Sequence, residues 1–520
     1  MKVAVCLVVK NEQTEIIYWA AWYKALGFDT IIIYDDFSDD ATEEVILSMQ
    51  GGIDIRYMRN AVNRDIHNVR QVRAYNDAVI RYGHEFDWIA FFDADEYLDL
   101  YGKNIKSYLS EQGDASLVAF NWCCVGTNGY VSRPEGVPFL NYTRTGSNEL
   151  FWNRHTKVIF RPDRLSRPVY QVHNVDVHGT SVDSEGLPVE WESPSGGFTR
   201  NIPTWKGARL IHYQSRSLEH YINRDRHLED VRRDVNDPLH TVVNNPEYNA
   251  IESTISGDYI RDFYKWMDHI VSQQTHTIAR VLRSTSSCFI TQLESILAPP
   301  NVPVFQPAYK AEAHEIAHNW ISFHTTPGKI LSEHFDGRSS FVAFHIENHF
   351  GHRLTSVDGK LSTDSENGIP LIGIYCEGSE YVHVFTSSGE ELRVNGDSRV
   401  TRVLTYKVWN NEDGSISISH PRTHRYLGFA PDGTYNIRKI RALAWESFNL
   451  KLVDIAECPQ FVRDAGVYLG RITSLEDLKR SCETAEQVDG LVINALTALD
   501  DVSKSAVSFL SRGILGEHIL

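Results

Sequence analysis

The amino-acid sequence predicts an α/β fold in its first part, a helical region in the middle and an all-β region towards the C-terminus. Three observations lead to this prediction. Short apolar runs alternate with amphipathic stretches up to about residue 100, a polar and helix-rich stretch begins near residue 217, and hairpin-like patterns recur after about residue 341. Hydrophobic residues make up 42% of the chain and charged residues 23%, which excludes whole-chain disorder and fibrous repeats.

The alternation in the first part predicts βαβ units around a parallel sheet, because the helices have the length of crossover connections. The expected strands are Val3–Val9, Thr30–Tyr34, Ile53–Met58 and Trp88–Phe92, and the expected helices are Glu15–Leu26, Ala41–Met49 and Asn68–Tyr82. Gly27 is a plausible residue to end the first helix. Beyond residue 116 the pattern becomes mixed, with strand-like segments at Leu117–Val125, Lys157–Phe160, Tyr170–Val177 and Arg209–Tyr213.

Two of these strands run directly into acidic clusters. Asp93-Ala94-Asp95-Glu96 follows the fourth strand, and Asp35–Asp40 follows the second. Ligands of such sheets bind at the carboxyl ends of the strands, so we expect both clusters to line one crevice. Asp93 and Asp95 could reach one hard divalent cation that is shared with substrate phosphates. The alternative, that a cluster only caps the next helix, suffices for Asp39 and Asp40.

Several function classes are disfavoured by what the sequence lacks. It contains no Walker A loop, no GxGxxG and no GxSxG, which argues against ATPases, dehydrogenases and α/β-hydrolases. The formal net charge of −17 argues against a general binder of nucleic acid or anionic membranes. No apolar run approaches the roughly 18–20 residues of a membrane span. Lys10 and Glu12 interrupt the first run, so we expect a strand there and no signal peptide. Seven cysteines without a CxxC pair suit a cytoplasmic protein.

The C-terminal part contains three hairpin-like units about 35–40 residues apart. They lie at 351–359, 389–397 and 424–433, and each combines a Gly-containing turn with a leucine at a core position: Leu354, Leu392 and Leu427. Three all-β repeats of this length fit a β-trefoil, for which 444–448 would be a closing strand. The stretch after Cys458 is expected to be helical, and 298–307 to be a linker or a crossing segment.

An ordered series of motifs in the first part resembles the GT-A glycosyltransferases of the family-2-like and family-92-like branch. The motifs are VKNE at 9–12, DDFSDD at 35–40, QVRAYN at 71–76, DADEYL at 93–98, WCCVGTNG at 122–129, KVIFRP at 157–162 and IHYQSRS at 211–217. Val125 replaces a usual Phe and Arg216 a usual Lys. The resemblance covers residues 1 to about 230. Residues 341–454 are similar to fascin-like trefoils but lack the Gln-x-Trp repeats of ricin-type trefoils.

The resemblance implies a GT-A-like, Rossmann-type mixed sheet at 1–230, a helical middle region and linker at 231–335, a trefoil at 336–456 and a helical tail at 457–520. It also implies a hexosyltransferase that uses Mn²⁺ or Mg²⁺ and a nucleotide-sugar donor, expected to be a UDP-sugar, with a glycan or other hydroxyl as acceptor. The residues implied for nucleotide-sugar binding are Asn11, Glu12, Asp35, Asp36, Arg73, Asp93 and Lys157. The residues implied for the metal are Asp93, Asp95 and His212.

An inverting transfer needs a general base beside the acceptor hydroxyl, usually Asp or Glu. The sequence does not choose among Glu135, Glu149, Asp176, His173 and His178. We favour Glu135, in a Pro-Glu-Gly turn beside the 126–129 loop, and keep Asp176 as a second candidate.

Two other functions stay open at this point. One is a carbohydrate- or protein-binding protein on a degenerate GT-A scaffold, in which the trefoil is the working module. Retention of Asp93, Asp95 and His212 argues against it, since a scaffold without activity does not need three metal-capable groups. The other is a metal-dependent nucleotidyltransferase or phosphatase, whose products would differ from those of sugar transfer.

Overall fold

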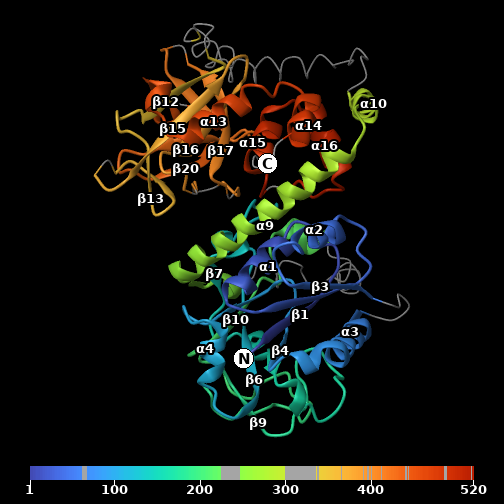
Figure 1. Ribbon diagram of the computed structural model, residues 1–520. Coiled ribbons are helices and arrows are strands. Elements are labelled where there is room, and N and C mark those ends of the chain that lie inside the picture. Colours follow the sequence, from blue (N-terminus) through green and yellow to red (C-terminus); the bar gives the residue numbers. More distant parts are fainter. Residues whose placement is uncertain are drawn as a thin grey trace, which may run out of the picture. The chain divides into compact units, whose positions relative to one another are not determined.

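The structure is a computed structural model that describes residues 1–60, 67–223, 246–298 and most of 335–520. In the last range the residues left out are 336–338, 365, 391, 395–396, 400, 412, 440–441, 443, 485–488 and 517. The chain divides into two compact units, Met1–Gln273 and Gln274–Leu520 (Figure 1). About half of the predicted middle region at 231–335, including 299–307 of the linker expected at 298–307, lies outside the described residues.

Unit 1 is built on a nine-stranded mixed sheet in the order β3-β2-β1-β4-β8-β6-β10-β5, with β9 paired to β6. Its strands are β1 (Val3–Val9), β2 (Thr30–Asp35), β3 (Ile55–Arg59), β4 (Trp88–Phe91), β5 (Glu96–Asp99), β6 (Ala115–Cys124), β8 (Thr156–Phe160), β9 (Thr180–Val182) and β10 (Arg209–His212). The first four strands in this order are parallel, as the βαβ pattern predicts. The strands β8 and β5 run antiparallel to their neighbours, and β7 (Arg144–Thr145) pairs separately with β11 (Ile251–Glu252).

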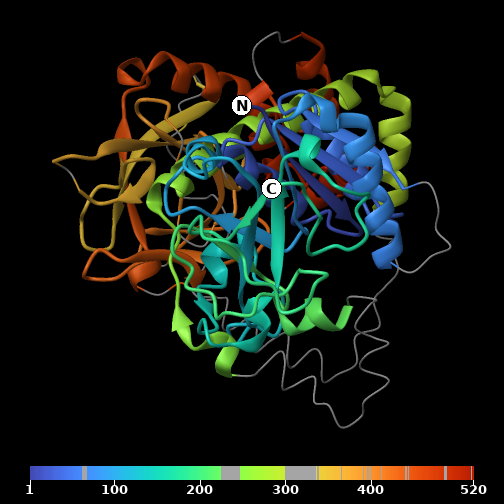
Figure 2. The ribbon, with the colours of Figure 1, turned by 90° about the horizontal axis from the view of Figure 1, so that it is seen from below.

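Helices cover both faces of this sheet. Ala74, Tyr75 and Ala78 of α3 (His67–Tyr82) pack with alternate residues of β1 on one face, and α3 lies along the strands in both views (Figures 1 and 2). The buried helix α1 (Ile16–Ala25) ends before Gly27, whose φ of +92° fits the predicted helix end. The remaining helices of this unit are α2 (Thr42–Met49), α4 (Ile105–Ser110), α5 (Pro138–Asn141), α6 (Leu218–Asn223) and the start of α9 (Gly257–Ser284), with 3₁₀ turns η1 (Gly83–Glu85), η2 (Phe151–Arg154), η3 (Pro162–Arg164) and η4 (Pro246–Asn249).

The predicted strand at Tyr170–Val177 is wrong, because this segment is irregular and makes only an isolated bridge, Leu165 to Val177. Val169 and Val175 nevertheless pack into the core on the α3 face. The Asn76 side chain accepts a hydrogen bond from the N–H of Val169 (2.9 Å) and donates one to its carbonyl (2.8 Å). A side chain therefore supplies the backbone partners that a neighbouring strand would otherwise provide.

Unit 2 contains a large antiparallel β-sheet. Its ten strands are β12 (Phe341–Asn348), β13 (Thr355–Val357), β14 (Lys360–Ser362), β15 (Ile369–Cys376), β16 (Tyr381–Thr386), β17 (Val403–Asn410), β18 (Ile416–Ser419), β19 (Tyr426–Phe429), β20 (Tyr435–Lys439) and β21 (Phe448–Val453). Leu354, Leu392 and Leu427, predicted at core positions, all lie in the buried core. The expected strand at 444–448 instead begins as the 3₁₀ turn η5 (Ala444–Glu446), and β21 starts only at Phe448.

The helices of unit 2 are α10 (Ser287–Leu297), α13 (Gln460–Leu469), α14 (Leu475–Thr484), α15 (Asp489–Ala498) and α16 (Asp501–Leu510), with the 3₁₀ turn η6 (Ile455–Glu457). The stretch after Cys458 is thus helical, as predicted. Within the described ranges, no helix has the length and apolar character needed to cross a membrane.

Candidate active site

The turn between β4 and β5 carries Asp93 and Asp95, and its backbone is held from several elements. The indole N–H of Trp19 on α1 donates to the Asp93 carbonyl (2.9 Å), and the N–H of Tyr213 donates to the Asp95 carbonyl (2.8 Å). The N–H of Asp93 donates to Glu96 Oε2 (2.8 Å). Burial raises the pKa of Glu96 well above its ordinary value. The position of both aspartates is therefore fixed by the fold.

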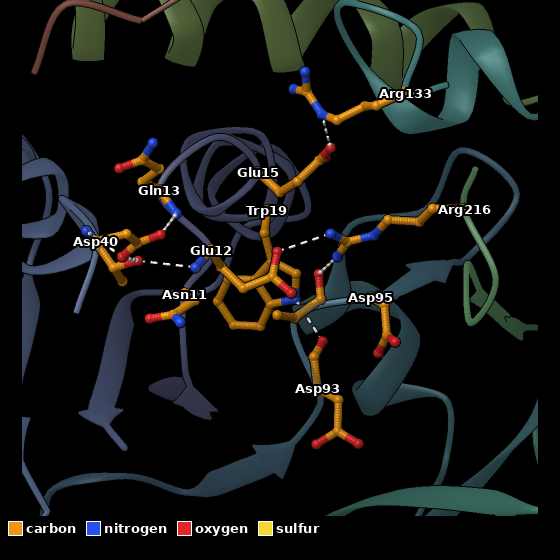
Figure 3. A network of polar contacts seen from close by, with 12 residues as sticks. Asn11, Glu12, Gln13, Glu15, Trp19, Asp40, Asp93, Asp95, Arg133 and Arg216 are labelled. Atoms are coloured by element: carbon orange, nitrogen blue, oxygen red, sulfur yellow. Dashed lines mark hydrogen bonds and ion pairs between the residues drawn. The ribbon is translucent and has the colours of Figure 1, made fainter. Parts of the chain in front are cut away.

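Arg216, just after β10, ties this turn to the loop that follows β1. Its guanidinium is 1% exposed and donates to Glu12 Oε2 (2.8 Å) and to the Ala94 carbonyl (3.2 Å). Burial would lower the pKa of Arg216, but the Glu12 and Glu15 carboxylates raise it. Glu15 forms a second ion pair, with Arg133 at 3.0 Å. In Figure 3 the carboxylates of the two aspartates point away from Arg216.

Asp93 is bound by two side chains. Lys157 on β8 places Nζ 2.9 Å from Oδ2, and Gln71 on α3 donates to Oδ1 (2.7 Å). Lys157 is fully buried, whereas the Asp93 side chain is 28% exposed. Burial would raise the pKa of Asp93, but the Lys157 ammonium holds it below its usual range. Burial would lower the pKa of Lys157, yet Asp93 and Glu96 raise it. The pair thus presents a charged lysine and a partly accessible carboxylate.

Asp95 lies beside His212, the last residue of β10. His212 Nε2 is 3.6 Å from Asp95 Oδ1, and both side chains are almost fully buried, with exposures of 9% and 1%. Nδ1 of His212 is buried and has no hydrogen-bond partner among the described residues. Buried imidazole nitrogens are normally satisfied, so Nδ1 is able to form a hydrogen bond or a metal bond that the protein itself does not provide.

A divalent cation fits part of this arrangement. The carboxylate of Asp95 and the imidazole of His212 are suitable donors for Mn²⁺ and lie close enough to share one ion. Asp93, the third predicted ligand, is engaged by Lys157 and Gln71. No group of three or more His, Cys, Asp or Glu side chains able to hold a metal occurs in the described part of the chain. Mg²⁺ commonly binds through one or two carboxylates and is completed by water and substrate phosphates, so two protein ligands are compatible with such a site.

The second acidic cluster has a different environment. Asp35, at the end of β2, accepts hydrogen bonds from the N–H of Ser38 (2.7 Å) and from the Tyr57 hydroxyl (3.0 Å). Asp36 accepts a bidentate pair from Arg70 on α3 (both 2.7 Å). Asn60 and His67 also contact Asp36. Burial would raise the pKa of Asp36, but these hydrogen bonds lower it. Both carboxylates are fully buried and already bound by the protein.

A basic pocket of about 450 Å³ lies between α3 and the ends of β2 and β3. Arg73, predicted to bind the nucleotide, is exposed and lines it. The other lining residues are Tyr34, Met58, Arg59, Asn60, Arg70, Ala74, Asp77 and Arg81. A volume of this size is within the usual range for small-molecule sites. Arginine guanidinium groups in such a pocket suit an anionic ligand.

The remaining predicted residues lie in loops. Asn11 is exposed after β1 and accepts a hydrogen bond from the N–H of Asp39 (3.0 Å), which joins the ends of β1 and β2. The carboxylate of Glu12 forms the ion pair with Arg216 described above. The carbonyl of Glu135 accepts a hydrogen bond from Asn141 (2.8 Å). The Asp176 carboxylate pairs with Arg167 (2.5 Å) and accepts from the Tyr170 hydroxyl (3.2 Å).

Sequence reasoning did not single out Arg70, Gln71, Glu96 or Arg216 as site residues. Gln71 and Arg70 lie on the same helix as Arg73, and helical spacing towards the strand ends is the signal that could have selected them. Glu96 is adjacent to Asp95 in sequence. The contact of Arg216 with Glu12 joins residues 204 positions apart, which no local pattern predicts.

Comparisons with known proteins agree with this part of the chain. Residues 1–255, just under half of the sequence, match the family described as Glycosyltransferase family 92. A family 92 glycosyltransferase protein of Arabidopsis thaliana is 24% identical over 229 residues, which cover 39% of this chain and 38% of that protein. One of Ricinus communis is 26% identical over 182 residues, covering 32% and 30%. The chain therefore spans about a third of the length of these curated relatives. The predicted glycosyltransferase resemblance of the first part is confirmed; the trefoil is not tested by these matches.

Solved structures give weaker likenesses. The S. aureus TarS fragment 1–349 is 16% identical, with a TM-score of 0.24, and the match covers 53% of this chain and 65% of that one. The glucosyl-3-phosphoglycerate synthase of Mycobacterium tuberculosis, solved with Mn²⁺, uridine diphosphate and phosphoglyceric acid, is 14% identical, with a TM-score of 0.22 and coverage of 35% and 68%. These scores are too low to support an argument about function.

Proposed function

We propose that this protein is a glycosyltransferase that moves a hexosyl group from a nucleotide diphosphate to a glycan or another hydroxyl acceptor. The observation that supports it best is the Asp95–His212 pair with its unsatisfied Nδ1, next to the Lys157–Asp93 ion pair. Asp93 and Asp95 follow β4, His212 ends β10 and Lys157 lies near the start of β8, all within the region that matches family 92. A UDP-sugar is the donor that we propose.

Each residue of the site has a proposed role in donor binding. Arg73 and the pocket it lines would receive the nucleoside end of the donor. The Asp93 carboxylate, oriented by Lys157 and Gln71, would accept hydrogen bonds from the ribose. Asp95 and His212 would hold a Mn²⁺ or Mg²⁺ ion, which stabilises negative charge on a diphosphate leaving group when bound.

The chemical step that we propose is inverting. The acceptor oxygen forms a bond to the anomeric carbon, the bond from that carbon to the diphosphate oxygen breaks, and the electron pair leaves with the nucleoside diphosphate. The acceptor proton passes to a general base. Glu135 stays our first candidate and Asp176 the second.

Three further predictions belong to the same proposal. The β-sheet of unit 2, proposed to be a fascin-like trefoil, would assist acceptor or partner binding. This role is proposed by analogy with other trefoils, because a fold alone does not determine a function. The transfer would take place in the cytoplasm. Nucleic acid is not a proposed partner, since the net charge is −17.

A thermal-shift experiment on the full chain tests donor and cation together. We expect UDP with Mn²⁺ to raise the unfolding temperature more than either alone, because ligands that bind only the folded state stabilise it, by about 2.7 kcal/mol at 100 times the Kd. The His212→Ala variant should lose the part of the thermal shift that depends on Mn²⁺. It should keep the smaller shift that UDP alone produces.

Product analysis provides the control for reaction class. Incubation with UDP-sugars should release UDP. Release of UMP or free phosphate would instead indicate the phosphoryl-transfer enzyme considered above. The absence of any thermal shift with UDP, GDP, ADP or CDP, with and without Mn²⁺, would leave the binding-protein alternative in place of the proposed enzyme.

A further inference from the structure

Two large aromatic side chains are exposed directly before β8, the strand that carries Lys157. Phe151 is 55% exposed and Trp152 is 47% exposed, and both belong to the 3₁₀ turn η2. Their rings meet edge to face with centroids 5.5 Å apart, and Phe198 lies 5.0 Å from Phe151. Neighbouring exposed aromatic rings of this kind mark interaction surfaces more often than single exposed residues do. We call Phe151 and Trp152 the aromatic surface.

The aromatic surface is held rigidly in spite of its exposure. Asn153, between β6 and the surface, is fully buried. Its Oδ1 accepts a hydrogen bond from the N–H of Cys124 (2.8 Å), and its Nδ2 donates to the carbonyl of Ser147 (2.7 Å). Arg154 donates to the carbonyl of Thr199 (2.7 Å). A fixed surface loses little conformational entropy when a ligand binds, which favours recognition.

A series of stacked rings connects this surface with the candidate active site. Trp152 stacks on His155, with centroids 5.6 Å apart and an interplanar angle of 17°. His155 stacks on Trp122 at 4.8 Å and 24°, and Trp122 contacts His212 at 4.1 Å. Trp122 is fixed in turn by the hydrogen bond from its indole N–H to Glu96 (2.8 Å). Three successive ring contacts therefore lead from the surface to the histidine beside Asp95.

The surroundings of the surface favour an uncharged ligand. Burial lowers the pKa of His155 and, together with the Lys157 charge, lowers the pKa of His173 to about 3, so both imidazoles are neutral near pH 7. Arg154 is neutralised by Glu192 at 2.8 Å. This ion pair reduces the positive charge that an anionic ligand would meet at Arg154, whose guanidinium lies 5.7 Å from the centre of the Phe151 ring. A sugar ring, which has one face of C–H groups and hydroxyls at its edge, matches aromatic rings bordered by paired polar groups.

We propose that Phe151 and Trp152 form a subsite for the acceptor glycan, in which a sugar residue stacks on these rings while another residue of the same glycan reaches the active site. This proposal rests on the proposed function. It names the acceptor as an uncharged oligosaccharide and not a monosaccharide or a protein side chain alone. The continuous series of ring contacts from the surface to His212, stacked as far as Trp122, is the observation that selects this occupant over others.

The test measures glycan binding and UDP release separately on the full chain. Fluorescently labelled protein is applied to a printed array of uncharged plant, animal and microbial oligosaccharides, and the apparent Kd is determined for the best-bound glycan. We expect Phe151→Ala and Trp152→Ala each to weaken this binding by about tenfold, the loss typical of a stacking contact and its buried area. Trp152→Phe should bind with intermediate strength. Circular dichroism and unfolding temperatures confirm that each variant is folded.

Two further variants separate the possible outcomes. Phe289→Ala removes an aromatic side chain of similar exposure (45%) from α10, outside the β-sheet of unit 2, and should leave glycan binding at the wild-type level. Asp95→Asn should keep glycan binding and lose UDP release. The proposal is overturned if no glycan binds the wild-type protein, if glycan binding depends on Phe289 and not on Trp152, or if the only effect of Trp152→Ala is to dissociate a dimer. Glycan binding that depends on Trp152, without UDP release from any UDP-sugar, would instead refute the proposed transferase and leave a glycan-binding protein.

Discussion

The strands β2 and β4 flank β1 in the sheet, and both end in paired acidic residues, yet the two ends differ in how their carboxylates are used. After β2, Asp35 and Asp36 are fully buried and accept hydrogen bonds from four or more protein groups. After β4, Asp93 is 28% exposed, and Asp95 faces a histidine with an unsatisfied nitrogen. Acidic residues at a strand end therefore either stabilise the fold or stand ready to bind a ligand, and the groups that contact them distinguish the two.

The difference originates in the helix α3, which supplies an arginine side chain to the β2 end and a glutamine amide to the β4 end. Arg70 of α3 neutralises Asp36, whereas Gln71 of the same helix donates to Asp93 without adding charge. The charge on Asp93 is instead balanced by Lys157 from β8. Asp95 lies beside the imidazole of His212, whose Nε2 is 3.6 Å from Asp95 Oδ1. A carboxylate and an imidazole at this separation can bind one divalent cation together.

The largest effect is expected for Asp95→Asn. This substitution keeps the shape of the side chain but removes the charge, so UDP release should fall roughly 100-fold or more, as for the loss of a group that stabilises a transition state electrostatically. The free energy of unfolding should change by less than about 1 kcal/mol, because the substitution also removes repulsion between Asp95 and Asp93. Initial rates with a saturating UDP-sugar and urea unfolding measure the two quantities.

Asp99→Asn is the matched control, because Asp99 is equally buried (1% exposed) but is paired with Arg209 at 2.9 Å. It should lose stability and keep UDP release. If Asp95→Asn retained wild-type rates, or if both variants lost activity in proportion to stability, the distinction between the two strand ends would fail.

Asp36→Asn should have the opposite profile. The substitution leaves Arg70, whose side chain is 13% exposed, without its counter-charge, and breaking such a pair destabilises a protein by about 3 kcal/mol. The control Asp262→Asn removes one carboxylate from an exposed ion pair with Lys265 and should cost no more than about 0.5 kcal/mol. Equal stability of the two variants would show that Asp36 is not the structural residue that its contacts indicate.

The pH dependence of unfolding sharpens the same prediction. Because hydrogen bonds from His67, Arg70 and Asn60 lower the pKa of Asp36 against the effect of burial, the folded state holds this carboxylate in its charged form more strongly than the unfolded state does. Its contribution is complete above the unfolded pKa of about 3.9 and is lost as the pH falls towards the folded pKa. The stability of Asp36→Asn should therefore fall less steeply than that of the wild type below about pH 4.

The sequence predicted the parallel part of the sheet well because the signals there are local. The apolar run Val3–Val9 coincides with β1, and the helix expected at Asn68–Tyr82 differs from α3 by one residue. Periodicity failed at Tyr170–Val177, since the core contacts of that segment are made without a neighbouring strand and its backbone is bound by Asn76. The antiparallel insertion of β8 between β4 and β6 joins distant segments, and no local pattern encodes such a pairing.

Prediction of the site was limited in the same way. Residue types and strand ends identified Asp93 and Asp95, the family resemblance added Lys157 and His212, and the structure brings these four into two contacting pairs. They could not reveal that Asp36 and Glu12 are neutralised by arginines, because those partners lie 34 and 204 residues away. A charged residue in a motif shows that a charge occurs at that position. Whether this charge can contact a ligand depends on the protein groups that long-range packing places beside it.

The smallest effect is expected at the β2 end itself, where four arginines and one carboxylate, Asp77, line the pocket. Arg73→Gln should weaken UDP binding by about two- to fivefold, since an exposed guanidinium contributes up to about 1 kcal/mol to an ionic contact. Arg81→Gln is the matched control in the same pocket, because Arg81 is already paired with Asp77 at 2.6 Å and its loss should change UDP affinity less. Isothermal titration with UDP measures both. Equal affinities for the wild type and Arg73→Gln would place the nucleotide away from this pocket, and the two strand ends would then share no ligand.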